Sequence, residues 1–174
     1  MSQVKIGTDE LKEKARTLRA GDRVLLSGTV YTARDAAHKR FFELLDNGEE
    51  LPFPLDGACI YYCGPTEAPA GLAVGSAGPT TSGRMDPYAP RLLDLGLSAM
   101  IGKGVRNDAV NEAIKRNGAV YFAAIGGAGA LYSKCITSLD VIAFSDLGPE
   151  SVKRLTFDDF PLIVATDSLG NTLY

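Results

Sequence analysis

One run of the sequence has the composition of an anion-binding loop. It reads Gly78-Pro79-Thr80-Thr81-Ser82-Gly83-Arg84-Met85-Asp86, so three hydroxyls and a guanidinium stand between or beside two glycines. Glycine lets the backbone approach a ligand closely, hydroxyls donate or accept hydrogen bonds without bulk, and the planar fork of Arg84 matches a carboxylate through two bonds. This combination predicts a site for a small anion.

Two other segments share this chemistry. Ser27–Lys39 leads an apolar strand through a glycine and hydroxyl turn to Arg34, and Met100–Gly104 places Lys103 between two glycines. Both cations, like Arg84, lie at junctions between a predicted strand and a loop. Ligands of open α/β sheets bind at the edge where the strands end, so we expect the three cations to converge there.

The elements that must position these residues alternate between helix and strand. Helices are predicted for Thr8–Ala20, Asp35–Asp46, Pro87–Leu95 and Asn107–Asn117. Strands are predicted for Arg23–Gly28, Ala58–Cys63, Gly71–Ala77, Ala99–Ile101, Ala119–Ala124, Val141–Phe144 and Pro161–Thr166. The glycine-rich segment Gly126–Ala130 is predicted to be a loop. Such alternation is typical of an α/β fold with a substantially parallel sheet.

Composition indicates one soluble domain covering residues 1–174. The chain is 45% hydrophobic and 22% charged, and its net charge of -3 argues against a general nucleic-acid or membrane-surface binder. No apolar stretch approaches the roughly 20 residues that span a bilayer. The segment Met1–Arg19 is charged and is expected to be helical rather than signal-like, so a cytoplasmic location is expected.

The three cysteines, Cys59, Cys63 and Cys135, are expected to be reduced and structural. An odd number in a chain of this size does not imply disulfides. Cys59 and Cys63 lie four apart in a predicted strand, where they share a face but are too separated to chelate a metal alone. We therefore expect no metal ligands in this chain.

Taken together, the three cationic segments resemble the C-terminal or β-subunit domain of the iron-sulfur-dependent hydro-lyases, the class I fumarate hydratase and L-tartrate dehydratase family. The resemblance runs from about Leu11 to the end and includes Lys134-Cys135-Ile136, Asp146-Leu147-Gly148 and Asp159-Phe160-Pro161. It implies a swivelling β/β/α domain, similar to the C-terminal domain of fumarase.

The resemblance also implies a function. The chain would be the β subunit of a hydro-lyase that reversibly hydrates a small dicarboxylate, with fumarate and (S)-malate as the first expectation and tartrate as the alternative. A [4Fe-4S] cluster would be held by an α subunit, without which this chain would be inactive. The isolated chain is a possible homodimer, and the general acid would lie on the partner and is not assigned.

Site roles follow from the same resemblance. Thr80 corresponds to the catalytic base, although it could instead only bind substrate or cap the turn. The substrate-binding residues would be Arg34, Arg84, Lys103, Ser82 and Gly83. Asp35 and His38 are placed behind them: His38 lies one turn into its predicted helix, where it could hydrogen-bond Asp35 or the loop, and Asp35 could pair with its neighbour Arg34.

Two readings outside catalysis stay open: a binding module for a small carboxylate or phosphate, and a purely structural assembly subunit. The segment Gly126–Gly129 follows a predicted strand but lacks the glycine spacing of a dinucleotide-binding loop, and no acidic residue follows at the required distance. We expect it to serve tight packing or subunit contact.

Overall fold

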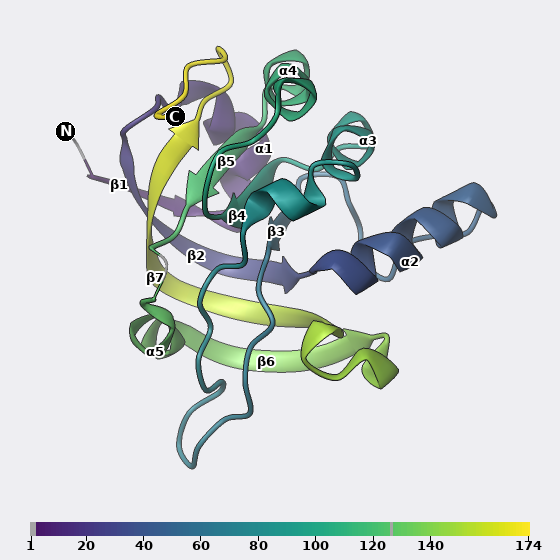
Figure 1. The fold of residues 1–174 in the computed structure, drawn as a ribbon. Helices are drawn as coiled ribbons and strands as arrows, with labels where there is room; N and C mark the ends of the chain where they lie inside the picture. Colours follow the sequence, from purple (N-terminus) through teal and green to yellow (C-terminus); the bar gives the residue numbers. More distant parts are fainter. Residues whose placement is uncertain (1–2, 126) are drawn as a thin grey trace.

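A mixed sheet that closes on itself forms the centre of the fold. The computed structural model describes residues 3–125 and 127–174. Its strands are β1 (Gln3–Gly7), β2 (Arg23–Thr32), β3 (Cys59–Tyr61), β4 (Ala99–Gly102), β5 (Val120–Ala123), β6 (Ile136–Ala143) and β7 (Val152–Thr166). Their order is β1-β2-β3-β4-β5-β7-β6, and β2 also pairs with β7. The strands β2, β3, β4, β5 and β7 therefore make a barrel-like ring, which Figure 1 shows to the left of the main helices.

The prediction of a parallel sheet is correct for only part of this ring. The pairs β1–β2, β2–β3, β3–β4 and β4–β5 are parallel, whereas β7 runs antiparallel to β2, β5 and β6. At 15 residues, β7 is long enough to pair along β2 on one side and with β6 and then β5 on the other. The β2–β7 register shifts between Leu26 and Gly28, and such bulges increase the local bend of a sheet.

The helices are α1 (Leu11–Lys14), α2 (Asp35–Asp46), α3 (Ala89–Asp94), α4 (Asp108–Asn117) and α5 (Gly129–Tyr132), with short 3-10 turns between elements. The predicted helix at Asp35–Asp46 is confirmed with its bounds. The predicted helix at Asn107–Asn117 is confirmed as α4, with Asn107 as its cap. The Asn107 side chain accepts a hydrogen bond from the Val110 amide at the start of the helix, and Gly118 ends the helix with φ 64°. None of the helices in the described residues is long and apolar enough to cross a membrane.

Alternating side chains on the strands fill two separate cores. Tyr61, Ile101 and Phe122 point into the ring, where they meet side chains from β2 and β7. Their neighbours, such as Met100 and Tyr121, point outward against α2, α3 and α4. The period of two that defines a strand thus gives one core inside the ring and a second core between the ring and the helices. The mixed α/β class is confirmed.

Several local predictions are wrong. Gly71–Ala77 is not a strand: it belongs to a loop between β3 and α3 that extends beyond β6 (Figure 1), and its backbone bonds join Thr66 to Gly75 and Ser76 instead of reaching the sheet. The charged N-terminal segment, expected to be helical, contains β1, and its helical part ends at Thr17 rather than Ala20. The expected loop Gly126–Ala130 runs into α5 at Gly129, while Gly126 lies outside the described residues, as do Met1 and Ser2.

Three predicted strands are too short. β2 continues four residues past Gly28, β6 begins at Ile136 rather than at Val141, and β7 begins at Val152 rather than at Pro161. In each case polar residues continue a strand because β7 pairs with β2 and β6 along this length. Local composition does not reveal such pairing.

Candidate functional site

The glycine and hydroxyl loop lies along the ends of two neighbouring strands. The Thr80 amide donates to the carbonyl of Tyr62, just after β3, over 2.7 Å, and the Ser82 amide donates to the carbonyl of Lys103, just after β4, over 2.9 Å. Thr81 also forms an isolated parallel bridge with Lys103. The loop is therefore fixed beside Lys103.

A polar cavity of about 420 Å³ brings Arg34 together with Thr80. It lies where the segment after β2 meets the loop after β3. The remaining lining residues are mostly small or hydroxylated: Gly64, Thr66, Ser76, Gly78, Pro79, Gly127, Gly129 and Ala130. Because these side chains are short, backbone and hydroxyl groups, together with one guanidinium, face the cavity, which is a surface for a small anion.

Arg34 is available to bind an anion. No carboxylate in the described part of the chain forms an ion pair with it, and its buried Nε has no hydrogen-bond partner there. A Cβ on Gly64 would lie 3.2 Å from Arg34 Nη1, so the glycine leaves room for the guanidinium. Arg34 thus directs an uncompensated charge to the cavity.

Arg84 does not line this cavity but pairs with Asp35, the first residue of α2. The side chains of Arg84 and Asp35 are 54% and 32% exposed, so the pair lies at the protein surface beside Arg34. The anticipated alternative, a pair between Asp35 and Arg34, is not formed. A ligand carboxylate that reaches Arg84 must therefore compete with Asp35.

The other residues of the loop differ in exposure. Lys103 is half-buried, lies outside the cavity lining and has no ion pair within residues 3–125 and 127–174. Ser82 is fully buried, with its Oγ 2.7 Å from the Tyr121 hydroxyl, whereas Gly83 is exposed. Ser82 thus fixes the loop from inside. Direct substrate contacts of Ser82 and Gly83 stay predictions.

His38 is buried behind the cavity. Its Nδ1 lies 2.9 Å from the carbonyl oxygen of Arg34, and since a carbonyl only accepts, Nδ1 carries the proton. Burial lowers the pKa of His38 to about 4. The neutral imidazole therefore supports the backbone of Arg34, and its place behind substrate-binding residues stays a prediction.

Sequence reasoning missed a buried ion pair at the base of the loop. Arg106 Nε donates to Asp86 Oδ1 over 2.6 Å, and the side chains are 0% and 8% exposed. The second carboxylate oxygen of Asp86 accepts from the Asn107 amide. One signal was present: Asp86 ends the glycine and hydroxyl run, and Arg106 follows Lys103 by three residues.

The thiols do not fit an iron-sulfur cluster. Cys59 and Cys63 belong to the core inside the ring, while Cys135 packs at its margin. Burial raises the pKa of Cys63 to about 12 and raises that of Cys59, so their thiolates, the form that binds iron, are disfavoured. No group of three or more His, Cys, Asp or Glu side chains suited to a metal occurs in the described ranges.

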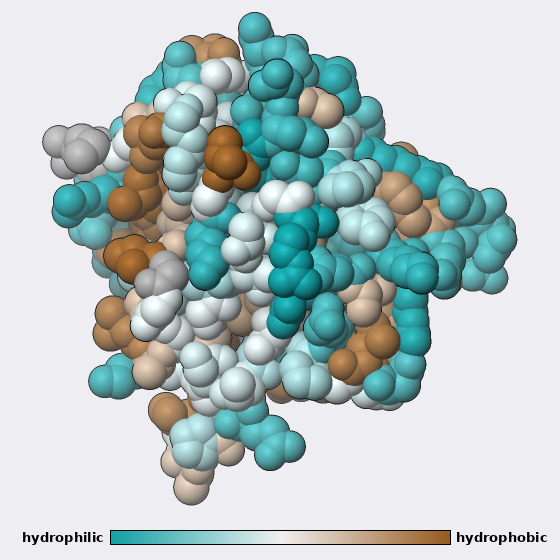
Figure 2. Space-filling view, in the orientation of Figure 1, coloured by the Kyte–Doolittle hydropathy of each residue, from teal (hydrophilic) through white to brown (hydrophobic). Residues whose placement is uncertain are grey.

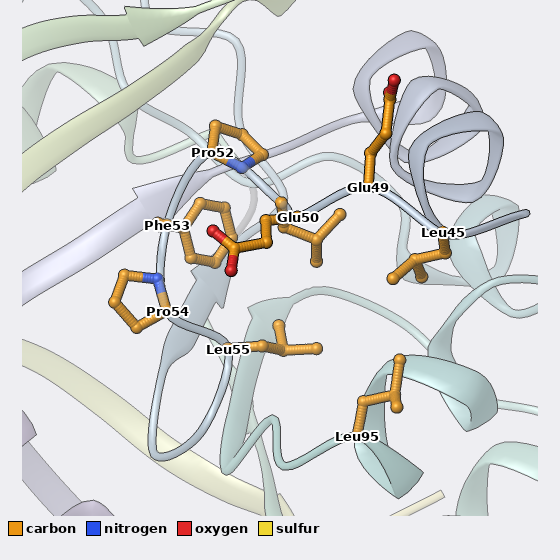
Figure 3. Close-up of a pocket in the computed structure, with 9 residues that line it drawn as sticks. Leu45, Glu49, Glu50, Pro52, Phe53, Pro54, Leu55 and Leu95 are labelled. Carbon is orange, nitrogen blue, oxygen red and sulfur yellow. The ribbon is translucent and has the colours of Figure 1, made fainter. Parts of the chain in front are cut away.

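A larger groove lies elsewhere and has the wrong chemistry for a dicarboxylate. It measures about 620 Å³ and is lined by Leu45, Phe53, Leu55 and Leu95 with prolines and two glutamates, of which Glu49 points away from the groove (Figure 3). It contains no cation. On the surface in Figure 2, α2 and α4 are largely hydrophilic, and hydrophobic residues gather along the left edge near β1, β7 and α5.

Comparison with known proteins identifies the family of this chain. The profile of the family described as Fumarase C-terminus matches residues 1–174. Fumarate hydratase 2 of Leishmania major is 40% identical over 168 residues, which cover 95% of this chain and 30% of that protein. The aerobic class I fumarate hydratase of Escherichia coli K12 is 40% identical over 154 residues, covering 87% of this chain and 28% of the relative.

A third relative has a similar length. The putative L(+)-tartrate dehydratase subunit beta of Methanocaldococcus jannaschii is 40% identical over 169 residues, covering 94% of this chain and 87% of that protein. By contrast, the chain spans less than a third of the two fumarate hydratases.

Proposed function

Because this chain belongs to the Fumarase C-terminus family, we propose that it is the β-type part of a hydro-lyase that reversibly hydrates a small dicarboxylate. Fumarate and (S)-malate are the proposed substrates, and tartrate is the alternative, supported by the name of the M. jannaschii relative. The observation that carries the proposal is that Arg34 and Thr80 line one polar cavity.

In this proposal the cations hold the substrate. Arg34 pairs with no carboxylate within the described residues and would bind one carboxylate of the substrate. The second carboxylate of the substrate would replace Asp35 as the partner of Arg84. Lys103, which the loop bonds keep next to Thr81, would add a third positive charge. Two carboxylates fixed in this way set the orientation of the two carbons between them.

Thr80 would remove the proton from one of these carbons, the neighbour of the carbon that bears the hydroxyl. Its backbone is fixed by the bond to Tyr62, and its side chain is half-buried in the cavity next to Arg34. A threonine hydroxyl is a weak base, and neighbouring cations would stabilise its alkoxide form. The same charges would stabilise the negative charge that develops on the substrate.

The rest of the enzyme belongs to a partner in this proposal. An α subunit would hold a [4Fe-4S] cluster, which supplies a Lewis acid for the substrate hydroxyl, and also the general acid. The name of the M. jannaschii relative, a subunit beta, supports a separate partner. We further propose that this chain is the swivelling β/β/α domain, is active only in the cytoplasmic complex, and forms homodimers when isolated.

The test is anaerobic co-expression with a candidate large subunit, followed by assays with malate and with tartrate. Thr80→Ala should reduce kcat by about 10²-fold or more, the range that one acid-base group contributes. Thr81→Ala is the matched control, because Thr81 is the adjacent, exposed threonine. Equal activity of the two variants would remove Thr80 as the base. Lack of any activity despite an intact cluster would favour the binding module.

A further inference from the structure

One buried guanidinium connects two of the three segments that carry the proposed site, the loop of Thr80 and the segment of Lys103. We infer that Arg106, together with Asp86, is a positioning residue that holds the loop of Thr80 against the strand end of Lys103. The inference rests on the proposed function for its catalytic meaning. Its structural part concerns the described residues alone.

Arg106 is tied first to the loop itself. Its Nε bonds Asp86, the last residue of the glycine and hydroxyl run, within the buried ion pair. Asp86 also accepts from the Asn107 amide over 2.8 Å, so both carboxylate oxygens are used. The end of the loop is thereby fastened to the segment that follows Lys103.

Arg106 also contacts the two strands on either side of β4. Its Nη2 donates to the Tyr62 hydroxyl over 3.2 Å, and its guanidinium carbon lies 5.2 Å and 4.8 Å from the ring centres of Tyr62 and Tyr121. Its Nη1 lies 3.5 Å from Met100 Sδ on β4 itself. A planar guanidinium, unlike a lysine, can make these lateral bonds and stack on rings at once.

Tyr62 and Tyr121 connect Arg106 to the residues of the proposed site. The carbonyl of Tyr62 accepts the Thr80 amide. The Tyr121 hydroxyl donates to the carbonyl of Gly104 over 2.8 Å and is hydrogen-bonded to Ser82 Oγ over 2.7 Å. Thr80, Ser82 and Lys103 thus belong to one network whose centre is the Arg106 side chain.

The position of Arg106 excludes direct substrate contact in this arrangement. Its side chain is 0% exposed, and it does not line the cavity of Arg34 and Thr80. Loss of the side chain would leave Asp86 as a buried carboxylate without its guanidinium, which is strongly unfavourable. The loop must then move to hydrate Asp86, and displacement by about 1 Å can lower a rate about 10²-fold.

The test compares Arg106→Met with Arg116→Met in the full chain. Arg116 forms an ion pair with Asp94 at the surface, with side chains 53% and 48% exposed, so it controls for loss of an arginine pair. Hydrogen exchange of residues 78–86 is measured on the chain alone, and kcat and KM on the reconstituted complex. Arg106→Lys keeps the charge but not the fork, and it should restore folding more than kcat.

Faster exchange in residues 78–86 of Arg106→Met, with unchanged exchange in Arg116→Met and a kcat lowered about 10²-fold, is the expected result. Lower thermal stability with unchanged exchange in the loop and unchanged kcat would overturn the inference. Should the reconstituted wild-type complex be inactive, the proposed function fails, while hydrogen exchange still decides whether Arg106 holds the loop.

The tyrosine link has its own test. Tyr121→Phe keeps the ring beneath Arg106 but removes the hydroxyl next to Ser82 and Gly104. If Arg106 acts through this network, the effects of Arg106→Met and Tyr121→Phe on kcat should be less than multiplicative when combined. Independent, multiplicative effects would show that Arg106 does not act through Tyr121.

Discussion

The ion pair between Arg84 and Asp35 makes a prediction about ligand affinity that can be worked out from exposure. Asp35→Asn removes the charge that competes for Arg84 while keeping the shape of the side chain. Pairs at the surface contribute about 0.2–1 kcal/mol, and the partial exposure of both partners places this pair in that class. Its removal should therefore tighten dicarboxylate binding by about 1.4-fold to 5-fold.

The assay is calorimetric titration of malate into the assembled complex at low salt, repeated at high salt. Exposed charges are screened by salt, so the gain should shrink as ionic strength rises. Asp46→Asn is the matched control: Asp46 ends the same helix, pairs with Arg91 and is 66% exposed, away from the cavity. It should leave the affinity unchanged.

Two results would refute this reasoning. Weaker binding by Asp35→Asn would show that Asp35 orients Arg84 for the substrate rather than competing with it. Unchanged binding would show that Arg84 does not contact a substrate carboxylate. Stability provides an independent check, because Asp35 also lies in the first turn of α2, where a negative charge is favourable by about 0.3–1 kcal/mol. The variant should unfold at a lower temperature regardless of its affinity.

Two further predictions concern the residues around the site. The pKa of His38 is about 4 in the folded chain and 6.5 ordinarily, so the unfolded chain binds more protons between these pH values. About 3 kcal/mol of stability is therefore present above pH 6.5 and is lost as the pH falls to 4. Urea unfolding of wild type and His38→Asn across that range checks this, and an equal pH dependence of the two would contradict it. A Cβ on Gly102 would collide with Ser82 Oγ and lie 2.9 Å from Tyr62 Cδ2, so Gly102→Ala should destabilise the chain by about 1–3 kcal/mol. A Cβ on Gly83 would lie 3.9 Å from its nearest neighbour, the Val105 carbonyl oxygen, so Gly83→Ala should cost far less. Denaturant midpoints measure both, and similar losses would show that the loop adapts.

Local signals in the sequence were sufficient for some elements. The helix Asp35–Asp46 follows from apolar spacing, and the helix before Gly118 from an asparagine cap and a glycine that adopts positive φ. These predictions succeed because the residues that form each helix turn or cap lie within a few positions of one another in the sequence. The glycine-rich segment Gly71–Ala77 failed as a strand, since its composition fits a close-packed strand as well as an exposed loop.

The sequence by itself also determined that Arg34 and Lys103 follow strands, and parallel strands bring such ends to one edge, whereas the strand predicted before the Arg84 segment is a loop. Tertiary structure alone decided the closure of the sheet by β7, the pairing of Asp35 with Arg84 rather than Arg34, and the burial of Arg106 against Asp86. These contacts join residues 20 to more than 100 positions apart. Which partner a charge meets depends on the three-dimensional arrangement of the strands, and no local period or cap encodes that choice.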